Sequence, residues 1–287
     1  MASVSATPRR EGRVTLRDGR SLAYAEWGDL SGRPVVLFHG APGSRLLCPD
    51  EDATVSAGVR LITIDRPGCG RSDPDPGLSV TTFSDDYAEL HGKLGLPPCP
   101  IVGWSGGGPY AVACAVRTPA QVSSVGLAAS MAPVEEFGEG WEEDRRIADL
   151  LRLDRAAGVA AIEARYVGLP DDPASAFADW DDPQDPDVQL LALPDVRDAF
   201  VQMVREAVRQ GLVGVVADDA ATFGPWGVSA ADVTQDVGVW LGSENRICRS
   251  DAEYLAATIP RATYVVFPGE GHLVPVPRWA EMLAWLH

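Results

Sequence analysis

The chain has 287 residues, with 24 Lys and Arg against 41 Asp and Glu, which gives a formal net charge of −17. Its 46% apolar and 23% charged content is typical of a folded globular protein with a sizeable core. The strong negative charge excludes nucleic acid and anionic membranes as partners, because both require clustered positive charge. We therefore expect a protein that acts on a small molecule; its oligomeric state leaves no trace in the sequence.

Location follows from what the sequence lacks. The N-terminal residues include no apolar run of the kind that secretory signals carry. No stretch reaches the roughly 18 apolar residues of a membrane helix. The five cysteines are scattered, without a C-x-x-C pair, which favours a reducing compartment over a disulfide scaffold. We expect a cytoplasmic protein, and the Ala-, Arg-, Gly- and Pro-rich composition suggests a bacterial one.

Short apolar runs alternate with helical segments along most of the chain. Arg13–Leu16 and Ser21–Trp27 predict a hairpin around Asp18-Gly19. Buried strands are predicted at Val35–Phe38, Val59–Ile64, Ile101–Trp104, Val122–Ala129, Val237–Leu241 and Thr263–Phe267. Helices are predicted at Leu46–Ala57, Val80–Leu94, Gly106–Arg117, Asp251–Ile259 and Pro277–His287. This alternation predicts an α/β fold whose mostly parallel central sheet is flanked by helices.

The alternation stops between about Pro133 and Trp226. That stretch predicts helices at Trp141–Leu153, Ala156–Val167 and Val196–Gln210. We expect residues 1–132 and 227–287 to form the core, and residues 133–226 to form a mainly helical cap on the rim of the sheet. Seven aspartates lie between Asp171 and Asp187. Their spacing lacks the turn glycine and terminal glutamate of a calcium loop, so a solvated acidic loop is the better interpretation.

The strongest local signal is Gly103-Trp104-Ser105-Gly106-Gly107, which follows a predicted strand and precedes a predicted helix. A nucleophile on such a sharp turn brings its neighbours close together, so the positions two residues to either side must lack side chains. The strand–turn–helix context therefore indicates that Ser105 is a nucleophile. The alternative is a glycine-rich turn used for packing or phosphate binding.

A serine nucleophile requires a base, and the chain has four histidines: His39, His91, His272 and His287. His272 follows the strand Thr263–Phe267 through a glycine-rich loop, at a strand end where sites of α/β proteins lie. We expect His272 to be the base. The histidines show no H-x-x-x-H pairing and the cysteines no ligand spacing, so no metal site is predicted.

A carboxylate should orient the histidine and stabilise its charged form. Glu244 is the first carboxylate after the strand Val237–Leu241, and the segment Ser130-Met131-Ala132 after the preceding strand has none. We therefore expect Glu244 to be the third catalytic residue. Asp219 and Asp236 are fallback acids in less suitable segments.

The order Ser105, Glu244, His272 resembles that of the α/β-hydrolase fold superfamily. His39-Gly40-Ala41-Pro42-Gly43 resembles its H-G-x-P oxyanion loop, and residues 65–72 and 269–272 resemble two further motifs. The resemblance implies that the backbone N–H groups of Ala41 and Gly106 form the oxyanion hole, that His39 and Pro42 shape the loop, and that no cofactor is needed. One position departs from the pattern: the family's acid, three residues after Gly242, is Asn245 here. A loop shortened by one residue would place Glu244 there and bring Ile247 into register.

These observations predict a serine hydrolase that cleaves a small carboxylic ester, lactone or thioester through an acyl-enzyme on Ser105. A non-hydrolytic acid–base enzyme, of the cyclase or carbon–carbon lyase type, and a proline-iminopeptidase-like aminopeptidase are the alternatives. A dinucleotide-binding oxidoreductase does not fit the glycine spacing, and a non-enzymatic binding protein does not explain an intact serine and histidine. Trp104 and Met131 are expected to line the pocket, together with His39. Of the cap aromatics, most are expected in the core of the cap itself: Trp141, Tyr166, Phe177, Trp180, Phe200, Phe223 and Trp226.

Overall fold

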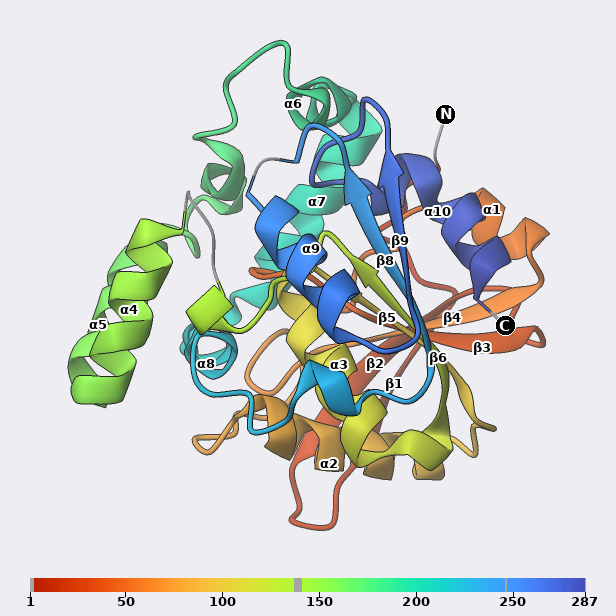
Figure 1. Ribbon diagram of the computed structural model, residues 1–287, viewed down its shortest axis with the longest axis horizontal. Helices are drawn as coiled ribbons and strands as arrows, with labels where there is room; N and C mark the ends of the chain where they lie inside the picture. The colour runs from red at the N-terminus through yellow and green to blue at the C-terminus, as the bar shows by residue number, and fades with distance from the viewer. Residues whose placement is uncertain (1–2, 137–140, 246, 287) are drawn as a thin grey trace.

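The computed structural model describes residues 3–136, 141–245 and 247–286, which are arranged around a central sheet (Figure 1). Within this part of the chain the sheet has eight strands in the order β1-β2-β4-β3-β5-β6-β8-β9. The strands are β1 (Arg10–Thr15), β2 (Ser21–Gly28), β3 (Arg33–Phe38), β4 (Val59–Ile64), β5 (Cys99–Trp104), β6 (Val122–Ala128), β8 (Asp236–Gly242) and β9 (Ala262–Phe267). β2 pairs antiparallel with β1 and with β4, and the other neighbours are parallel. The predicted α/β fold with a mostly parallel sheet is confirmed.

Helices cover both faces of the sheet and bury two separate apolar cores. On one face, α1 (Glu51–Ser56) packs against α10 (Pro275–Trp285), where the Trp279 indole N–H donates to the Thr54 hydroxyl at 2.9 Å. The other face carries α2 (Val80–Lys93), α3 (Gly108–Arg117) and α9 (Arg249–Thr258). Because helices bury the central strands on both faces, the sequences of these strands are almost continuously apolar.

Residues 133–226 contain five α-helices in the described part of the segment: α4 (Glu142–Leu153), α5 (Arg155–Tyr166), α6 (Pro186–Leu191), α7 (Pro194–Ala207) and α8 (Val213–Thr222). A short strand, β7 (Arg209–Leu212), precedes α8 and lies outside the eight-stranded sheet. The α4–α5 hairpin projects from the body of the molecule (Figure 1), and Asp154 caps α5 through the backbone N–H groups of Ala156 and Ala157. The helical character of this segment matches the expectation, while its role as a cap stays a prediction.

Several element boundaries differ from those predicted. The helix expected at Leu46–Ala57 is shortened to α1, because Asp50 caps its first turn and Cys48 forms a β-bridge with Ser5. The helix expected to run to Gln210 ends at Ala207. Helices α6 and α8 were not predicted. α8 contains Val213, Val215 and Val216, residues that favour strands, but its backbone packs at Gly214 directly against Gly68, and tertiary contact decides the helix.

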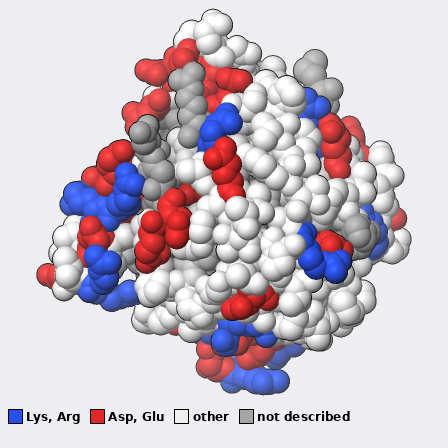
Figure 2. All heavy atoms as spheres, viewed as in Figure 1, with Lys and Arg blue, Asp and Glu red and all other residues white. Residues whose placement is uncertain are grey.

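The topology brings the ends of distant segments together. The carboxyl ends of β3, β5, β8 and β9 lead into the segments that begin at His39, Ser105, Ser243 and Pro268. Parallel neighbours end at the same edge of a sheet, so these segments lie side by side there. On the face seen in Figure 2, acidic side chains gather over the segment around α6, away from the body of the sheet.

Candidate active site

Ser105 occupies the turn between β5 and α3 with a φ of +52°, a left-handed conformation that non-glycine residues rarely adopt. A Cβ on Gly103 would lie 2.6 Å from the Gly107 carbonyl oxygen, and a Cβ on Gly107 would collide with the carbonyl oxygen of Phe38. The two glycines therefore allow the close approach that the turn requires, as the sequence predicted. A strained backbone at a turn whose serine is only partly buried is typical of a functional position.

Gly106 and Ala41 lie side by side next to this serine. An ideal Cβ on Gly106 would be 3.5 Å from the Ala41 backbone nitrogen, and one on Gly40 would be 3.9 Å from the Ser105 hydroxyl oxygen. A 3-10 turn begins at Ser105 and continues into α3, so the positive end of this helical segment faces the same space. The fold thus brings together the two residues that were expected to donate backbone N–H groups to an oxyanion.

His272 lies in the loop after β9 and is held from two sides. The Trp104 indole N–H donates to the His272 carbonyl oxygen at 3.1 Å, which ties the histidine loop to the residue before Ser105. Asp187 of α6 accepts the backbone N–H groups of His272 and Leu273 at 2.6 and 2.7 Å. Within the described residues no hydrogen bond joins the Ser105 hydroxyl to the His272 ring, a contact that in free enzymes often tightens only when substrate binds.

Asp187 is the acidic residue that sequence reasoning missed. Of the seven aspartates between 171 and 187, five are exposed, as a solvated loop predicts, but Asp187 is buried. Burial raises the pKa of its carboxyl to about 6, although the two backbone N–H groups oppose the rise. A side chain on Gly271 would collide with this carboxylate. Gly271, directly before His272, was the one feature of the sequence that indicated another group packed closely against this loop.

The prediction that Glu244 orients His272 is wrong, because Asn245 and not Glu244 faces the His272 ring. Asn245 Nδ2 lies 3.2 Å from His272 Nδ1, whereas Glu244 is exposed and accepts a hydrogen bond from the Ser243 hydroxyl. The physical reason is a tight turn in which the Asn245 N–H donates to the Gly242 carbonyl oxygen. Glu244 occupies the outer corner of that turn, and the loop is not shortened by one residue.

The fallback acids also lie elsewhere. Asp236 forms an exposed ion pair with Arg261 at 2.6 Å. Asp219 accepts a hydrogen bond from the Tyr166 hydroxyl at 2.7 Å, and burial raises its pKa to about 7. Among the residues that the structure describes, no charged group offsets the burial of His272, which lowers the pKa of the imidazole to about 4. The ring therefore stays neutral over the physiological pH range.

Cys248 is a second unpredicted neighbour of the same ring nitrogen. Its sulfur lies 3.8 Å from His272 Nδ1, and its backbone N–H donates to Asn245 Oδ1 at 3.1 Å. Burial raises the pKa of this thiol, so it is protonated at neutral pH. Three neutral groups, Asn245, Cys248 and His272, thus meet where a carboxylate was expected.

Aromatic side chains surround the histidine. The ring centroids of Trp104 and Trp180 lie 6.2 and 6.4 Å from that of His272, and Phe200 packs edge-to-face on Trp104 at 5.8 Å. Phe177 contacts both Trp180 and Phe200. Three of the aromatic side chains that were expected in the core of the cap therefore lie near the site, whereas Trp226 is buried against α8, with its indole N–H donating to the Thr222 carbonyl oxygen. Met131 was predicted to line the pocket together with Trp104. It lies beside Ser105, because its backbone N–H donates to the Ser105 carbonyl oxygen at 3.4 Å.

A buried ion pair supports the oxyanion loop from below. Arg66 donates to the carbonyl oxygens of His39 and Gly40 at 2.6 and 3.1 Å, and it donates two further hydrogen bonds to the Asp218 carboxylate of α8. His39 is buried, with Nδ1 donating to the Gly40 carbonyl at 2.7 Å, and burial holds its pKa well below the usual range. This agrees with a loop-shaping role for His39, and the Arg66–Asp218 pair was not predicted.

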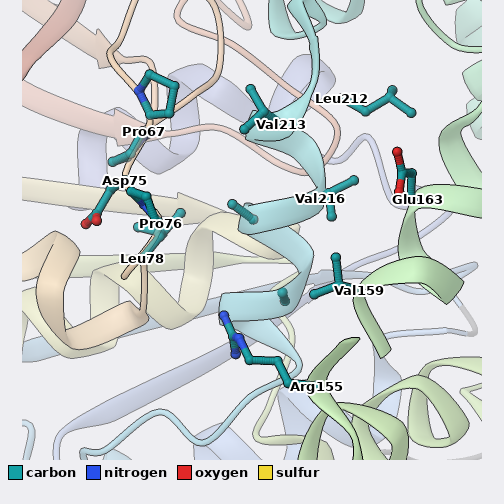
Figure 3. Close-up of a pocket in the computed structure, with 13 residues that line it drawn as sticks. Pro67, Asp75, Pro76, Leu78, Arg155, Val159, Glu163, Leu212, Val213 and Val216 are labelled. Atoms are coloured by element: carbon teal, nitrogen blue, oxygen red, sulfur yellow. The ribbon is translucent and has the colours of Figure 1, made fainter. Parts of the chain in front are cut away.

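A cavity of about 490 Å³ lies outside this constellation. It is formed between α8, α5 and the segment 67–78; in Figure 3 Pro67 and Pro76 lie on one side of α8, and Val159 and Glu163 of α5 lie on the other. Neither Ser105 nor His272 lines it. In the part of the chain that the structure describes, His, Cys, Asp and Glu side chains form no metal-binding group of three, and no helix has the length and hydropathy to cross a membrane.

Comparison with known proteins agrees with the fold. The model of the "Alpha/beta hydrolase family" matches residues 35–285. The non-heme chloroperoxidase of Streptomyces lividans is 34% identical over 172 residues, 58% of this chain and 61% of that protein, and a proline iminopeptidase of Xylella fastidiosa is 32% identical over 42% and 40%. This chain thus spans less than two thirds of either relative. An esterase structure from Thermogutta terrifontis has a TM-score of 0.67 at 24% identity and covers 96% of both chains, which shows the shared fold. The chain belongs to the α/β hydrolase family.

Proposed function

We propose that this protein is a serine hydrolase that cleaves a small carboxylic ester, lactone or thioester through an acyl-enzyme on Ser105. The observation that carries the proposal is the strained serine at φ +52°, placed beside Ala41 and Gly106 at the end of β5. This arrangement supports the proposal because a hydroxyl on such a turn can attack a carbonyl carbon while neighbouring backbone N–H groups bind the carbonyl oxygen.

In the proposed reaction Ser105 attacks the carbonyl carbon, and the N–H groups of Ala41 and Gly106 stabilise the oxyanion. Each such donor contributes on the order of 10²–10³ to the rate. The Ser105 hydroxyl gives its proton to a base, for which the sequence predicted His272, and the bond to the leaving group breaks with its electron pair as the acyl-enzyme forms. Water then releases the acid. None of these steps requires a metal or an organic cofactor.

Asn245 makes this hydrolase a slow one. A neutral amide does not stabilise an imidazolium as a carboxylate does, and an Asp→Asn change in a serine-protease triad lowers the rate about 10⁴-fold. The pKa of about 4 at His272 points in the same direction, because a ring that resists protonation is a weak base. We therefore expect slow turnover of acyl substrates.

A second function is favoured by the same observation. A neutral imidazole can polarise a substrate carbonyl by donating a hydrogen bond, so the Asn245–His272 contact also suits a non-hydrolytic reaction through an enolate, of the cyclase or lyase type. Activity that persists in Ser105→Ala would favour this function. The aminopeptidase alternative gains no such support, because both oxygens of the cap carboxylate at this site, Asp187, already accept backbone N–H groups.

The proposal is tested by covalent labelling. The protein and its Ser105→Ala variant are incubated with a small fluorophosphonate at pH 9 and analysed by intact-protein and peptide mass spectrometry. We expect one adduct, on Ser105, that is absent from the variant, and slow release of nitrophenolate from p-nitrophenyl acetate. A folded protein that gains no adduct and releases no nitrophenolate would overturn the hydrolase.

A further inference from the structure

We propose that Asn245 holds the neutral His272 ring with its proton on Nε2, the nitrogen that would otherwise act as base toward Ser105, and thereby restricts the site to acyl substrates whose leaving group departs without a proton. Asn245 is then a positioning residue that acts through His272. The substrate restriction rests on the proposed acyl-enzyme at Ser105, while the position of the proton does not.

The orientation of the Asn245 amide is fixed by Cys248. The backbone N–H of Cys248 only donates, and it lies 3.1 Å from Asn245 Oδ1. A flipped amide would set two donors against each other at this contact. The NH₂ group of Asn245 must therefore point the other way, toward His272 Nδ1 at 3.2 Å. Asn245 is buried, so solvent does not offer it another partner.

This orientation decides which ring nitrogen carries the proton. An amide NH₂ has no lone pair to offer, so His272 Nδ1 must be the acceptor. The protonated thiol of Cys248, 3.8 Å away, can donate a second, weaker hydrogen bond to that nitrogen. A neutral imidazole has one proton, which is then on Nε2. A carboxylate at position 245 would impose the opposite arrangement, because it accepts a hydrogen bond from Nδ1–H.

A proton on Nε2 changes both proton transfers of a serine hydrolase, the one from Ser105 and the one to the leaving group. Nε2–H has no lone pair with which to take the Ser105 proton, and giving its own proton to a leaving group would leave an imidazolate anion. Solvent hydroxide must remove the Ser105 proton, forming water. The alkoxide then attacks the carbonyl carbon, and the bond to the leaving group breaks with its electron pair. A phenolate, enolate or thiolate departs unprotonated, whereas an alkoxide does not. Hydroxide finally cleaves the acyl-enzyme to carboxylate and Ser105.

The first test locates the proton by NMR. The chain has four histidines and a single asparagine, so ¹⁵N labelling of these two residue types gives few signals. His272 is assigned by difference with His272→Gln. In the wild type at pH 7 we expect Nδ1 to resonate as an unprotonated nitrogen and Nε2 as a protonated one. In Asn245→Asp the assignment reverses. Cys248→Ala, which keeps the backbone N–H that orients Asn245, serves as the matched control and keeps the wild-type pattern.

The second test measures the consequence for catalysis. Rates are compared for acetate esters of p-nitrophenol, phenol and ethanol between pH 6 and pH 10. In the wild type we expect the rate to rise about tenfold per pH unit without a plateau and to fall steeply as the leaving group becomes more basic. Asn245→Asp should gain about 10²- to 10⁴-fold on ethyl acetate at pH 8, show a plateau above the pKa of its imidazole, and depend less on the leaving group.

The outcomes separate this inference from the proposed function. A wild-type ring protonated on Nδ1 overturns the inference, whatever the kinetics show. An Asn245→Asp variant that is folded, as judged by its circular dichroism, and has an unchanged pH profile overturns the restriction on substrates. If no ester is cleaved by either protein while Nε2 carries the proton, the proton position stands and the hydrolase fails. The wild-type spectrum decides the proton position even if the variant does not fold.

Discussion

The two halves of the candidate site are built in different ways. The nucleophile half, at the ends of β3 and β5, is shaped by backbone: Ser105 at positive φ, Gly103 and Gly107 in close contact, and Ala41 against Gly106. The histidine half, at the ends of β8 and β9, is shaped by side chains: Asn245 and Cys248 at one ring nitrogen, and Asp187 beneath the loop. The first half conforms to the family pattern, and the second departs from it.

This difference shows which features of an active site can be changed by amino-acid substitution. Backbone contacts leave no room for an added Cβ, so the nucleophile half tolerates little variation without loss of the fold. A side chain that faces the histidine can be replaced by another of the same shape, and Asn is isosteric with Asp. The chemistry of the site is therefore tuned in the histidine half.

The largest effect is expected from Ser105→Ala, which removes the proposed nucleophile. Hydrolysis of p-nitrophenyl acetate should fall at least about 10³-fold. Ser105→Gly should be equally inactive but more stable by about 1 kcal/mol, because glycine adopts the positive φ without strain. Chemical denaturation of the three proteins checks this, and equal stability of Ser105→Gly and the wild type would contradict stored strain at the turn.

Gly107→Ala tests the backbone packing of the nucleophile half. Its added Cβ would collide with the Phe38 carbonyl oxygen, so we expect a loss of about 2–3 kcal/mol in the free energy of unfolding. Gly92→Ala is the matched control: Gly92 is helical, and a Cβ there would meet open space. That variant should be stabilised by up to about 1 kcal/mol. Similar values for the two variants would show that the predicted collision does not exist.

Asp187→Asn tests the link between α6 and the histidine loop. Above pH 6 the Asp187 carboxylate accepts both the His272 and the Leu273 N–H, whereas an amide offers one oxygen. At pH 8 we expect a loss of about tenfold in kcat/KM, since a displaced catalytic loop is costly. Below its pKa of about 6 the wild-type carboxyl is protonated and loses the same acceptor. Below pH 6 the wild type should therefore lose activity more steeply than the tenfold per pH unit expected from hydroxide alone, and the variant should lack this additional loss.

The same variant also tests how the stability of the folded protein depends on pH. The pKa of Asp187 is higher in the folded protein than the usual value for aspartate, 3.8, so folded Asp187 binds its proton more tightly. Its contribution to stability is fully present below pH 3.8 and is lost as the pH rises through about 6. Asp187→Asn should lack this pH dependence. A wild type and a variant whose unfolding midpoints change in parallel with pH would contradict the raised pKa.

Glu244→Gln should have the smallest effect, less than about twofold in kcat/KM. The side chain is exposed and contacts Ser243 rather than the histidine. If Glu244 did orient His272, its neutralisation would cost orders of magnitude. A loss greater than tenfold would restore the residue to the site and remove the contrast between the two halves.

The sequence predicted the mostly parallel sheet, the positions of the sheet strands after β1, and the serine turn, but it placed the end of a helix where the short strand β7 begins. Continuous apolar runs identify buried strands, and the glycines around Ser105 allow the close backbone contacts that a sharp turn requires. The same reasoning missed α8, whose valines favour strands but whose backbone contact with Gly68 is made by residues far apart in sequence. It also assigned most of the cap aromatics to the cap's own core, although Trp180 and Phe200 lie around His272 and Trp104.

What the sequence determined by itself was therefore local: the alternation of strands and helices, the elbow at Ser105 and the glycine-rich approach to His272. Only the tertiary structure decided the partners of His272. Whether Glu244 or Asn245 faces the ring depends on a turn closed by Gly242 and on pairing with the loop after β9, where the Glu244 N–H donates to the Glu270 carbonyl. Asp187 lies 85 residues before the backbone N–H that it accepts. Such contacts follow from how distant segments pack, which no spacing along the chain encodes.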